Sequence, residues 1–493
     1  MHPDVVEDYL QTEIRLGRLV GPFPPHAVPN IHISRFGVIP KSHQMNKWRL
    51  IVDLSFPTDR SVNDGIPKEL CSLKYITIDD AVEHIVRSGP GTHLAKIDIK
   101  SAFRLLPVHV ADRHLLGVQW RGAVFVDTCL PFGLRSAPKL FNILADLLAW
   151  ILEQHGVQPL LHYLDDFLTI GPPHSHTCQQ NLDTIKQVCD ILGVPLALEK
   201  VEGPATCLSF LGITLDTTAM EARLPPEKLQ RLRLLVAEWI GKSKATKRDI
   251  LSLVGQLQHA TKVIRQGRTF VSRIYMTAAK VKRLDFYTRL NREFRSDLCW
   301  WDTFLNQWNG LSLLRWSTGQ QIPDATIQTD ASGSWGCGAF FQGRWLQWQW
   351  SHEWISVGIM AKELTPIILS CAAWGNTLWR QRVLFQCDNK SVVASIQKGS
   401  CKDQQVMHLL RTLTFFTAYY DIELIVEHIP GVANTTADHL SRNNMLLFFR
   451  LNPQAQLLPT PLPSPLQVML TPPWEDWTAT SFRSQFSNIL SKV

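Results

Sequence analysis

The hydrophobic pattern of this 493-residue chain divides it into stretches of different periodicity. In residues 26–215, short runs rich in β-branched and aromatic residues alternate with runs of helical period. Residues 216–315 are basic, helical in pattern and rich in Leu and Trp, and residues 322–445 return to the alternation of strands and helices. No internal repeat is visible. We therefore predict two α/β regions separated by a helical region.

The first α/β region contains the clearest individual elements. A helix is expected over Val5–Leu19, before a break formed by Gly, Pro and Phe residues. A second helix is expected over Pro138–Gln154, where apolar residues recur at helical spacing. Strands are expected at Trp48–Leu54, His93–Ile97, Ala123–Cys129, Leu160–Tyr163 and Phe167–Ile170.

The C-terminal segment differs in composition from the rest of the chain. Residues 453–473 hold seven prolines (453, 459, 461, 463, 465, 472 and 473), which predicts an extended linker. Residues 474–493 resemble the beginning of an element that this sequence does not finish.

The overall composition indicates a globular intracellular protein. Hydrophobic residues make up 45% and charged residues 19% of the chain. No apolar run reaches the ~18 residues that span a bilayer, and the N-terminus has no secretory apolar core, so neither a membrane nor a secretory route is expected. Cytoplasm and nucleus are not distinguished. The 10 cysteines form no CxxC pair and are expected to be reduced thiols.

The net charge of +7 is distributed unevenly. Residues 223–295 contain 18 Lys and Arg against 5 Asp and Glu, a surplus of 13, so the remainder of the chain has a net charge of −6. A basic block in an otherwise acidic chain indicates a polyanionic partner such as nucleic acid. The alternative is a solvated helix surface without a partner. Within this block a helix is expected over Lys247–Lys262, with Gln256 and His259 directed away from its apolar face.

Three acids lie at the ends of strands predicted in the first α/β region. Asp165 and Asp166 separate two apolar strands, which predicts a hairpin with both acids at its tip. An Asp-Asp turn alone is usually a solvated turn. Asp98 ends a third apolar strand, and strands of one sheet can bring all three acids together. Such a set could hold two Mg²⁺ ions about 4 Å apart, as phosphoryl transfer requires.

These motifs resemble the palm of reverse transcriptases, and the resemblance covers most of residues 15–445. Asp98 corresponds to the family's first metal-binding acid, and Tyr163-Leu164-Asp165-Asp166 corresponds to its YxDD box. The resemblance also implies a set of substrate-binding residues. Arg49 would face the triphosphate, on a strand that begins near Lys47. Phe103 would be the gate against a ribose hydroxyl, Lys200 would donate a proton to pyrophosphate, and Tyr163 would also bind substrate.

Two further motifs extend the resemblance. Leu130-Pro131-Phe132-Gly133 stands where many relatives have LPQG, so the role of that glutamine is not carried over to Phe132. Ser209-Phe210-Leu211-Gly212 resembles the primer grip.

A second set of acids follows the basic block. Asp330 and Asp388 end predicted strands, Glu363 lies near the start of a predicted helix whose first turn would contain Pro366, and Asp438 follows a Pro-Gly turn. Four such acids could form a cage for two Mg²⁺ ions and an attacking water. The set resembles the DEDD residues of the RNase H family, and His428 stands where retroviral members have a histidine that assists product release or proton transfer. A loop histidine without a function is the alternative.

The two resemblances together imply an α/β (α+β) chain: a right-hand polymerase with fingers, a ferredoxin-like palm and a thumb, followed by an RNase H-like domain with a mixed sheet. The implied partners are an RNA template, a DNA primer, RNA–DNA hybrid and dNTPs. The implied cofactor is Mg²⁺, two ions per active site, with Mn²⁺ as a substitute. The predicted segments are an N-terminal helix and linker (1–25), fingers and palm (26–215), thumb and connection (216–320), RNase H-like domain (321–445), and a Pro-rich linker with a truncated tail (446–493).

Several short strings are similar to the DIRS-type retrotransposons that encode a tyrosine recombinase, so a recombinase or other retroelement protein is an expected partner. They include Gly21-Pro22-Phe23, Leu134 to Pro138, Ser252 to Gln258 and Ala361 to Leu364. There are two alternatives to an enzyme that has both polymerase and nuclease activities. One is a decayed or domesticated copy that only binds nucleic acid, and the other is a DNA-templated polymerase, which the RNase H resemblance disfavours.

Overall fold

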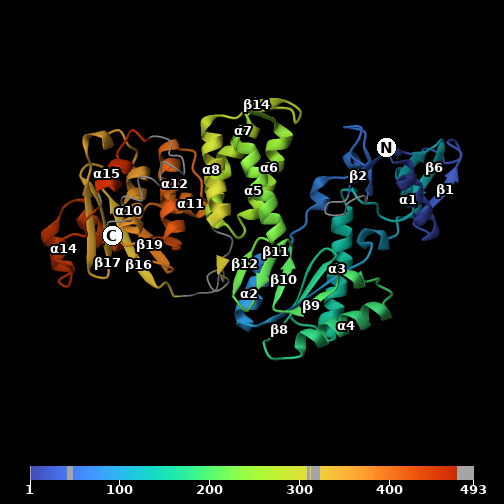
Figure 1. Cartoon of the computed structure of the whole chain (residues 1–493), viewed down its shortest axis with the longest axis horizontal. Coiled ribbons are helices and arrows are strands. Elements are labelled where there is room, and N and C mark those ends of the chain that lie inside the picture. Colours follow the sequence, from blue (N-terminus) through green and yellow to red (C-terminus); the bar gives the residue numbers. More distant parts are fainter. Residues whose placement is uncertain (1, 41–47, 308–310, 313–321, 463, 475–493) are drawn as a thin grey trace. The chain divides into compact units, whose positions relative to one another are not determined.

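The computed structural model describes residues 2–40, 48–307, 311–312, 322–462 and 464–474. The chain divides into two compact units, Met1–Met220 and Glu221–Val493. Strands and helices are both present in each unit (Figure 1). Among the described residues, no helix has both the length and the apolar character needed to cross a membrane.

The N-terminal part of the first unit is a five-stranded sheet with α1 (Pro3–Arg15) packed against it. Val6 and Leu10 of α1 are buried with Val118 and Phe125 of the sheet. The strand order is β1 (Leu19–Phe23), β6 (Ala123–Asp127), β5 (Gly117–Trp120), β2 (Ile33–Pro40) and β3 (Trp48–Asp53).

The predicted N-terminal helix ends earlier than the hydrophobic pattern suggested. Gly17 adopts a positive φ of 70° directly after the C-cap Leu16, which is the backbone conformation that commonly ends a helix. The prediction that the helix continues to Leu19 is therefore wrong. Leu19 instead begins β1, which pairs antiparallel with β6.

A four-stranded antiparallel sheet is the second sheet of this unit, and helices pack on it. Its core joins Ile97 and Phe167 of the sheet to Phe141 of one helix and Leu182 of another. The strand order is β7 (Leu160–Tyr163), β8 (Asp166–Gly171), β4 (His93–Asp98) and β9 (Glu202–Ala205), and the two helices are α3 (Ala137–Gln154) and α4 (Thr177–Ile191). This unit also contains α2 (Ile78–Ser88), the hairpin of β10 (Cys207–Phe210) and β11 (Ile213–Asp216), and short 3-10 helices.

The second unit begins with the basic helical region. Its helices are α5 (Pro226–Ile240), α6 (Lys247–Ala260), α7 (Ser272–Ala279) and α8 (Arg292–Gln307). Two short strand pairs accompany them: β12 (Glu221–Arg223) with β15 (Leu311–Ser312), and β13 (Lys244–Thr246) with β14 (Tyr287–Arg289). The helix predicted over Lys247–Lys262 is thus present and ends at Ala260.

A five-stranded mixed sheet forms the other part of the second unit. The central strand β16 (Ala325–Ala331) pairs antiparallel with β17 (Gly336–Phe341) and parallel with β19 (Arg382–Cys387). Strands β18 (Arg344–Gln349) and β20 (Glu423–His428) complete it. The accompanying helices are α10 (Ile359–Ala373), α11 (Lys390–Lys398), α12 (Gln404–Tyr419) and α13 (Thr435–Ser441).

Residues 445–462 and 464–474 pack onto this sheet domain, although an extended linker was predicted for most of them. They contain α14 (Met445–Leu451) and α15 (Ser464–Leu470), and Leu466 and Leu470 are fully buried. The indole nitrogen of Trp345 donates a 2.7 Å hydrogen bond to the carbonyl of Gln456. Prolines interrupt residues 453–473, as the sequence showed. The Leu and Met residues between them supply apolar surface, which the prediction of a linker did not take into account.

Pro366 also lies elsewhere than predicted. Helix α10 begins at Ile359, so Pro366 is in its interior and not in its first turn. Its ring nitrogen cannot donate to the carbonyl four residues earlier. Nearly every residue of α10 from Ala361 to Cys371 is buried, and we infer that this packing outweighs the loss of one backbone hydrogen bond.

Candidate active sites in the two units

The register of the four-stranded sheet brings the first three acids together. Asp98, the last residue of β4, lies directly opposite Asp166, the first residue of β8. Asp165 occupies the tight turn between β7 and β8, beside Leu164, whose φ of 54° is left-handed. The amide of Ile99 donates a 2.9 Å hydrogen bond to the carbonyl of Asp165, which fixes the turn against the end of β4.

Crowding of carboxylates alters the acidity of this cluster. Burial, together with the neighbouring charges of Asp165 and Asp98, raises the pKa of Asp166 to about 6. Burial and the charge of Asp98 also raise the pKa of Asp165. A cation bound among these oxygens would remove the repulsion. The cluster therefore offers hard oxygen ligands of the kind that Mg²⁺ prefers.

Lys200 provides a positive charge at this cluster. Its Nζ lies 3.0 Å from Oδ1 and 3.1 Å from Oδ2 of Asp98. Partial burial lowers the pKa of Lys200, but the hydrogen bond and charge of Asp98 outweigh it and the net pKa is raised. The side chain is 58% exposed, so it can move away from Asp98 when another cation or a substrate arrives.

Phe103 forms part of an aromatic group beside the cluster. Its ring lies 5.2 Å from the ring of Phe132 and 5.6 Å from that of Phe141, centroid to centroid. Phe141 is fully buried in α3, whereas Phe132 is 54% exposed. The residues before Phe103, Ser101 and Ala102, both have positive φ values, which turn the chain sharply after β4. The core residue Phe141 thus supports the ring of Phe103, which also packs against Phe132.

Two residues that support this site were missed in the sequence. The ring of Tyr75 stacks on Tyr163 with centroids 4.7 Å apart. Asn63 donates a 2.9 Å hydrogen bond to the carbonyl of Gly133 and accepts one of 2.8 Å from the amide of Arg135, which anchors the loop that carries Phe132. No local pattern marks either residue, because both act on segments distant in the sequence.

The four acids of the second set come from separate elements of the mixed sheet domain. Asp330 lies in the central strand β16, Glu363 in the second turn of α10, Asp388 directly after β19 and Asp438 in α13. Carboxylate oxygens of Glu363 and Asp388 lie within 4.8 Å of each other and of the sulfur of Cys387. Asp330 interacts electrostatically with both Asp388 and Asp438.

Burial is the main influence on this second cluster. It raises the pKa of Glu363 to about 9, with further contributions from the charges of Asp330 and Asp388. Burial also raises the pKa of Asp330 to about 6, against the opposing effect of a hydrogen bond from the hydroxyl of Ser441. Arg442 donates a 2.6 Å hydrogen bond to Asp438, whose side chain is 35% exposed. The cluster is therefore deeply buried at Glu363 and open to solvent at Asp438.

His428 lies close to this cluster through the sheet. It is the last residue of β20 and is opposite Cys387 in the parallel register of β19 and β20. The loop after it returns to Asp388, because a Cβ atom on Gly431 would lie 3.2 Å from Oδ2 of Asp388. The structure thus places His428 on the strand next to β19, opposite Cys387, which directly precedes Asp388.

Comparison with known proteins gives a family for part of the chain. Residues 39–215 match the model of the family described as reverse transcriptase (RNA-dependent DNA polymerase). This range contains Asp98, Asp165 and Asp166 and the sheet that aligns them. Residues 39–215 are a reverse transcriptase domain.

The chain is also similar to a retrotransposon protein. Over 183 residues the chain is 26% identical to the Retrovirus-related Pol polyprotein from transposon 412 of Drosophila melanogaster. The match covers 36% of this chain and 13% of that polyprotein.

A solved structure of a reverse transcriptase shares the fold of this chain. A foamy viral protease-reverse transcriptase in complex with double-stranded DNA superposes with a TM-score of 0.51 at 14% sequence identity, covering 86% of this chain and 69% of that chain. A foamy viral protease-reverse transcriptase in complex with RNA/DNA hybrid gives a TM-score of 0.47 at 14% identity, covering 86% and 53%. The chain thus has the α/β architecture of reverse transcriptases with fingers, palm and thumb, as predicted from the sequence.

Two other predicted parts of the reverse transcriptase domain can be located. Arg49 lies on β3 opposite Ile39, but its side chain and the whole of Lys47 are outside the described residues. Ser209 and Phe210 end β10, and Leu211 and Gly212 form the turn to β11. Lys96 donates a 3.2 Å hydrogen bond to the carbonyl of Ser209.

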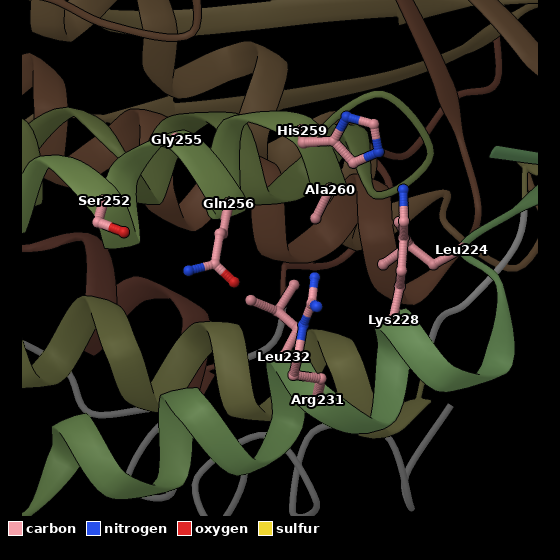
Figure 2. Close-up of a pocket in the computed structure, with 9 residues that line it drawn as sticks. All are labelled: Leu224, Lys228, Arg231, Leu232, Ser252, Gly255, Gln256, His259 and Ala260. Carbon is pink, nitrogen blue, oxygen red and sulfur yellow. The ribbon is translucent and has the colours of Figure 1, made fainter. Parts of the chain in front are cut away.

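Beyond the reverse transcriptase domain, helices α5 and α6 line an open basic pocket of about 300 Å³ (Figure 2). Lys228 and Arg231 of α5 point toward α6, and Gln256 of α6 points back toward α5. Partial burial and the charges of Arg231 and Lys262 lower the pKa of Lys228. The remaining lining residues are Leu224, Leu232, Ser252, Gly255, His259 and Ala260. The Lys and Arg of this pocket thus both belong to α5, and α6 contributes the polar side chains of Ser252, Gln256 and His259.

Proposed function

We propose that the chain is an RNA-directed DNA polymerase combined with an RNA–DNA hybrid nuclease, encoded by a retrotransposon. The observation that carries the proposal is the register of β4 and β8, which sets Asp98 opposite Asp166 with Asp165 at the adjoining turn. This arrangement lies inside the domain that matches reverse transcriptases. The proposed substrates are an RNA template, a DNA primer and dNTPs.

Mg²⁺ fits the ligands of the first site. Asp98, Asp165 and Asp166 offer only carboxylate oxygens, and their mutual repulsion would be relieved by divalent cations. Two bound Mg²⁺ ions, or Mn²⁺ in their place, would activate the primer 3′-hydroxyl and stabilise the leaving oxygen. Phe103 would exclude a ribose 2′-hydroxyl with its ring, and Lys200 would hold a proton near the departing pyrophosphate. Tyr163 and Arg49 would contact the nucleotide or the primer end.

The second site is proposed to cleave the RNA strand of the hybrid that the first site makes. Asp330, Glu363, Asp388 and Asp438 would hold two Mg²⁺ ions, which would activate water for attack on a phosphodiester. Oε2 of Glu363 has no hydrogen-bond partner in the part of the chain that the structure describes, which supports a cation there because a buried carboxylate oxygen without a partner is unfavourable. His428 would assist proton transfer or product release from the adjacent strand end.

Parallel assays on the full chain test both activities. Primer extension on an RNA template with Mg²⁺ should occur, and hybrid cleavage should be measurable in the same preparation. Asp165→Asn should abolish extension and leave cleavage within about twofold of the parent protein. Asp388→Asn should do the reverse.

A second candidate function is nucleic-acid binding without catalysis, as in a decayed or domesticated copy. The surplus of 13 positive charges in residues 223–295 favours binding whether or not the chain is active. Tight binding of hybrid without extension or cleavage by the parent protein would favour this alternative. Loss of both activities in either single variant, with the fold intact, would contradict two separate sites.

The retrotransposon is proposed to be of the DIRS type. The support is Phe132 in place of the common glutamine, together with the strings around Leu134, Ser252 and Ala361. The proposed partner is then a tyrosine recombinase encoded by the same element. Sequencing of the genomic neighbourhood tests this, since an adjacent integrase or protease reading frame without a recombinase would contradict it.

A further inference from the structure

Cys387 adds a sulfur ligand to the carboxylates of the second site. It is the last residue of β19 and has no exposed surface. Its Sγ, a carboxylate oxygen of Glu363 and one of Asp388 all lie within 4.8 Å of one another. The amide of Asn389 donates a 3.4 Å hydrogen bond to this sulfur, which orients it beside the carboxylates. Neither the proposed nuclease mechanism nor the four-acid motif uses this thiol.

The surroundings of Glu363 favour a cation at this position. Its side chain is 6% exposed, and its Oε2 has no hydrogen-bond partner among the described residues. Leaving a buried polar atom unpaired is unfavourable. Asp388 is only half-buried, so a small ion can reach the group from solvent.

The mixture of ligands selects a particular class of metal. Mg²⁺ favours oxygen ligands and does not use thiolates. Zn²⁺ and the chemically similar Cd²⁺ bind thiolate sulfur together with carboxylate oxygen. We propose that Glu363, Cys387 and Asp388 form a binding site for a thiophilic divalent cation of the Zn²⁺ and Cd²⁺ class.

Binding there would inhibit the second active site. The metal–sulfur bond forms as the S–H bond of Cys387 breaks, and the proton passes to solvent. Two of the three ligands, Glu363 and Asp388, are shared with the proposed Mg²⁺ site, so the two kinds of ion exclude each other. This inhibitory consequence rests on the proposed nuclease function, whereas the binding site itself does not.

The first experiment measures binding without any activity. Full-length protein, freed of metal, is titrated with Cd²⁺ while the ultraviolet absorption of the Cd²⁺–thiolate bond is recorded. The parent protein should show one saturable high-affinity step, and Cys387→Ser should lose that step. Cys371→Ser is the matched control, because Cys371 is an equally buried thiol of α10 whose pKa is shifted by burial alone. It should titrate like the parent protein.

A second pair of variants protects against a folding defect in Cys387→Ser. Cys387→Ala should also lose the high-affinity step, and Glu363→Gln should weaken it at least tenfold while keeping the thiol. Circular dichroism checks that each variant is folded. Identical titrations of the parent protein, Cys387→Ser and Cys387→Ala would overturn the proposal.

The second experiment measures inhibition. Zn²⁺ is added to hybrid-cleavage reactions at fixed Mg²⁺, and the half-inhibitory concentration should rise at least tenfold in Cys387→Ser. An unchanged half-inhibitory concentration would refute the inhibitory role. Absence of Mg²⁺-dependent cleavage in every protein would refute the nuclease function, while the Cd²⁺ titration would still decide whether the thiol site exists.

Discussion

At the scale of single residues, the acids could be found in the sequence but much of their surroundings could not. Asp98, Asp165 and Asp166 were detectable because each ends or begins an apolar strand. Tyr75 contacts Tyr163, and Cys387 contacts Glu363, only through the tertiary fold. An acid at the end of an apolar strand can be recognised from the local sequence, whereas the residues that lie beside it in the folded protein cannot.

The packing of Phe103 leads to a prediction about sugar selection. Because Phe141 supports its ring from the core, Phe103 should act as a fixed wall against the nucleotide. Phe103→Ala should raise ribonucleotide incorporation, relative to deoxyribonucleotide incorporation, by about 100-fold. Single-nucleotide extension with each substrate measures this ratio. Phe103→Tyr, which keeps the ring, should retain selection. An unchanged ratio in Phe103→Ala would show that Phe103 is not the gate.

The raised pKa of Glu363 predicts a pH dependence of stability in the absence of divalent metal. Because the folded-state pKa of about 9 exceeds the ordinary value of 4.5, the folded state binds the proton more tightly than the unfolded state. The stabilisation is complete below pH 4.5 and is lost as the pH rises to about 9, by at most ~1.4 kcal/mol per pH unit. Glu363→Gln should remove this part of the slope.

Thermal unfolding in EDTA across this pH range measures the effect. Mg²⁺ should reduce the slope in the parent protein, because bound cations favour the ionised carboxylate. Parallel pH profiles for the parent protein and Glu363→Gln would contradict the assignment of the slope to this side chain.

At the scale of secondary-structure elements, the core strands and helices were predicted well and the segments at the periphery were not. Leu160–Tyr163 forms a strand with the bounds predicted, because its apolar run is bounded on both sides by polar or turn residues. The errors fell at Leu19, Pro366 and residues 453–473. In each case tertiary packing decided the conformation against a local signal, as when α15 buries its apolar residues on the sheet domain.

The attachment of α1 gives a prediction at this scale. Arg104 donates hydrogen bonds of 2.9 Å and 2.7 Å to Glu13 of α1, and it also pairs with Asp127 of β6 at 2.7 Å. The Arg104 side chain is only 3% exposed. Glu13→Ala should lower the free energy of opening α1 and β1 by about 2–3 kcal/mol, because charge-assisted hydrogen bonds are lost in a buried setting.

A matched variant is available on the same helix. Glu7 pairs with Arg121 at 3.0 Å, but the two side chains are 44% and 62% exposed. Glu7→Ala should therefore change the opening free energy by less than about 1 kcal/mol. Hydrogen exchange of the α1 and β1 amides in the full chain reports both values. Equal effects of the two substitutions would show that burial of the Arg104 cluster does not stabilise the attachment of α1.

At the scale of the whole molecule, charge distribution was the feature that the sequence revealed most directly. The surplus in residues 223–295 can be counted without a structure, since like charges gather in one segment. The pocket between α5 and α6 could not be predicted, because Lys228 and Arg231 meet Gln256 only when the two helices pack. The fold thus converts a property of composition into a localised cationic surface.

This surface should govern how salt weakens the binding of nucleic acid. Each phosphate neutralised by a Lys or Arg adds about 0.9 to the slope of log affinity against log salt concentration on a B-form duplex. The double variant Lys228→Gln, Arg231→Gln should therefore reduce the slope for an RNA–DNA hybrid by up to about 2, with a similar effect on hybrids of different sequence.

Fluorescence anisotropy at several salt concentrations measures the slopes. Arg380→Gln, which alters an exposed arginine paired with Asp421 outside residues 223–295, is the control and should leave the slope unchanged. If the double variant binds with the parent slope, the basic helices do not contact the phosphates. The surplus of positive charge in residues 223–295 would then belong to a solvated helix surface without a partner, which is the alternative that the sequence also allowed.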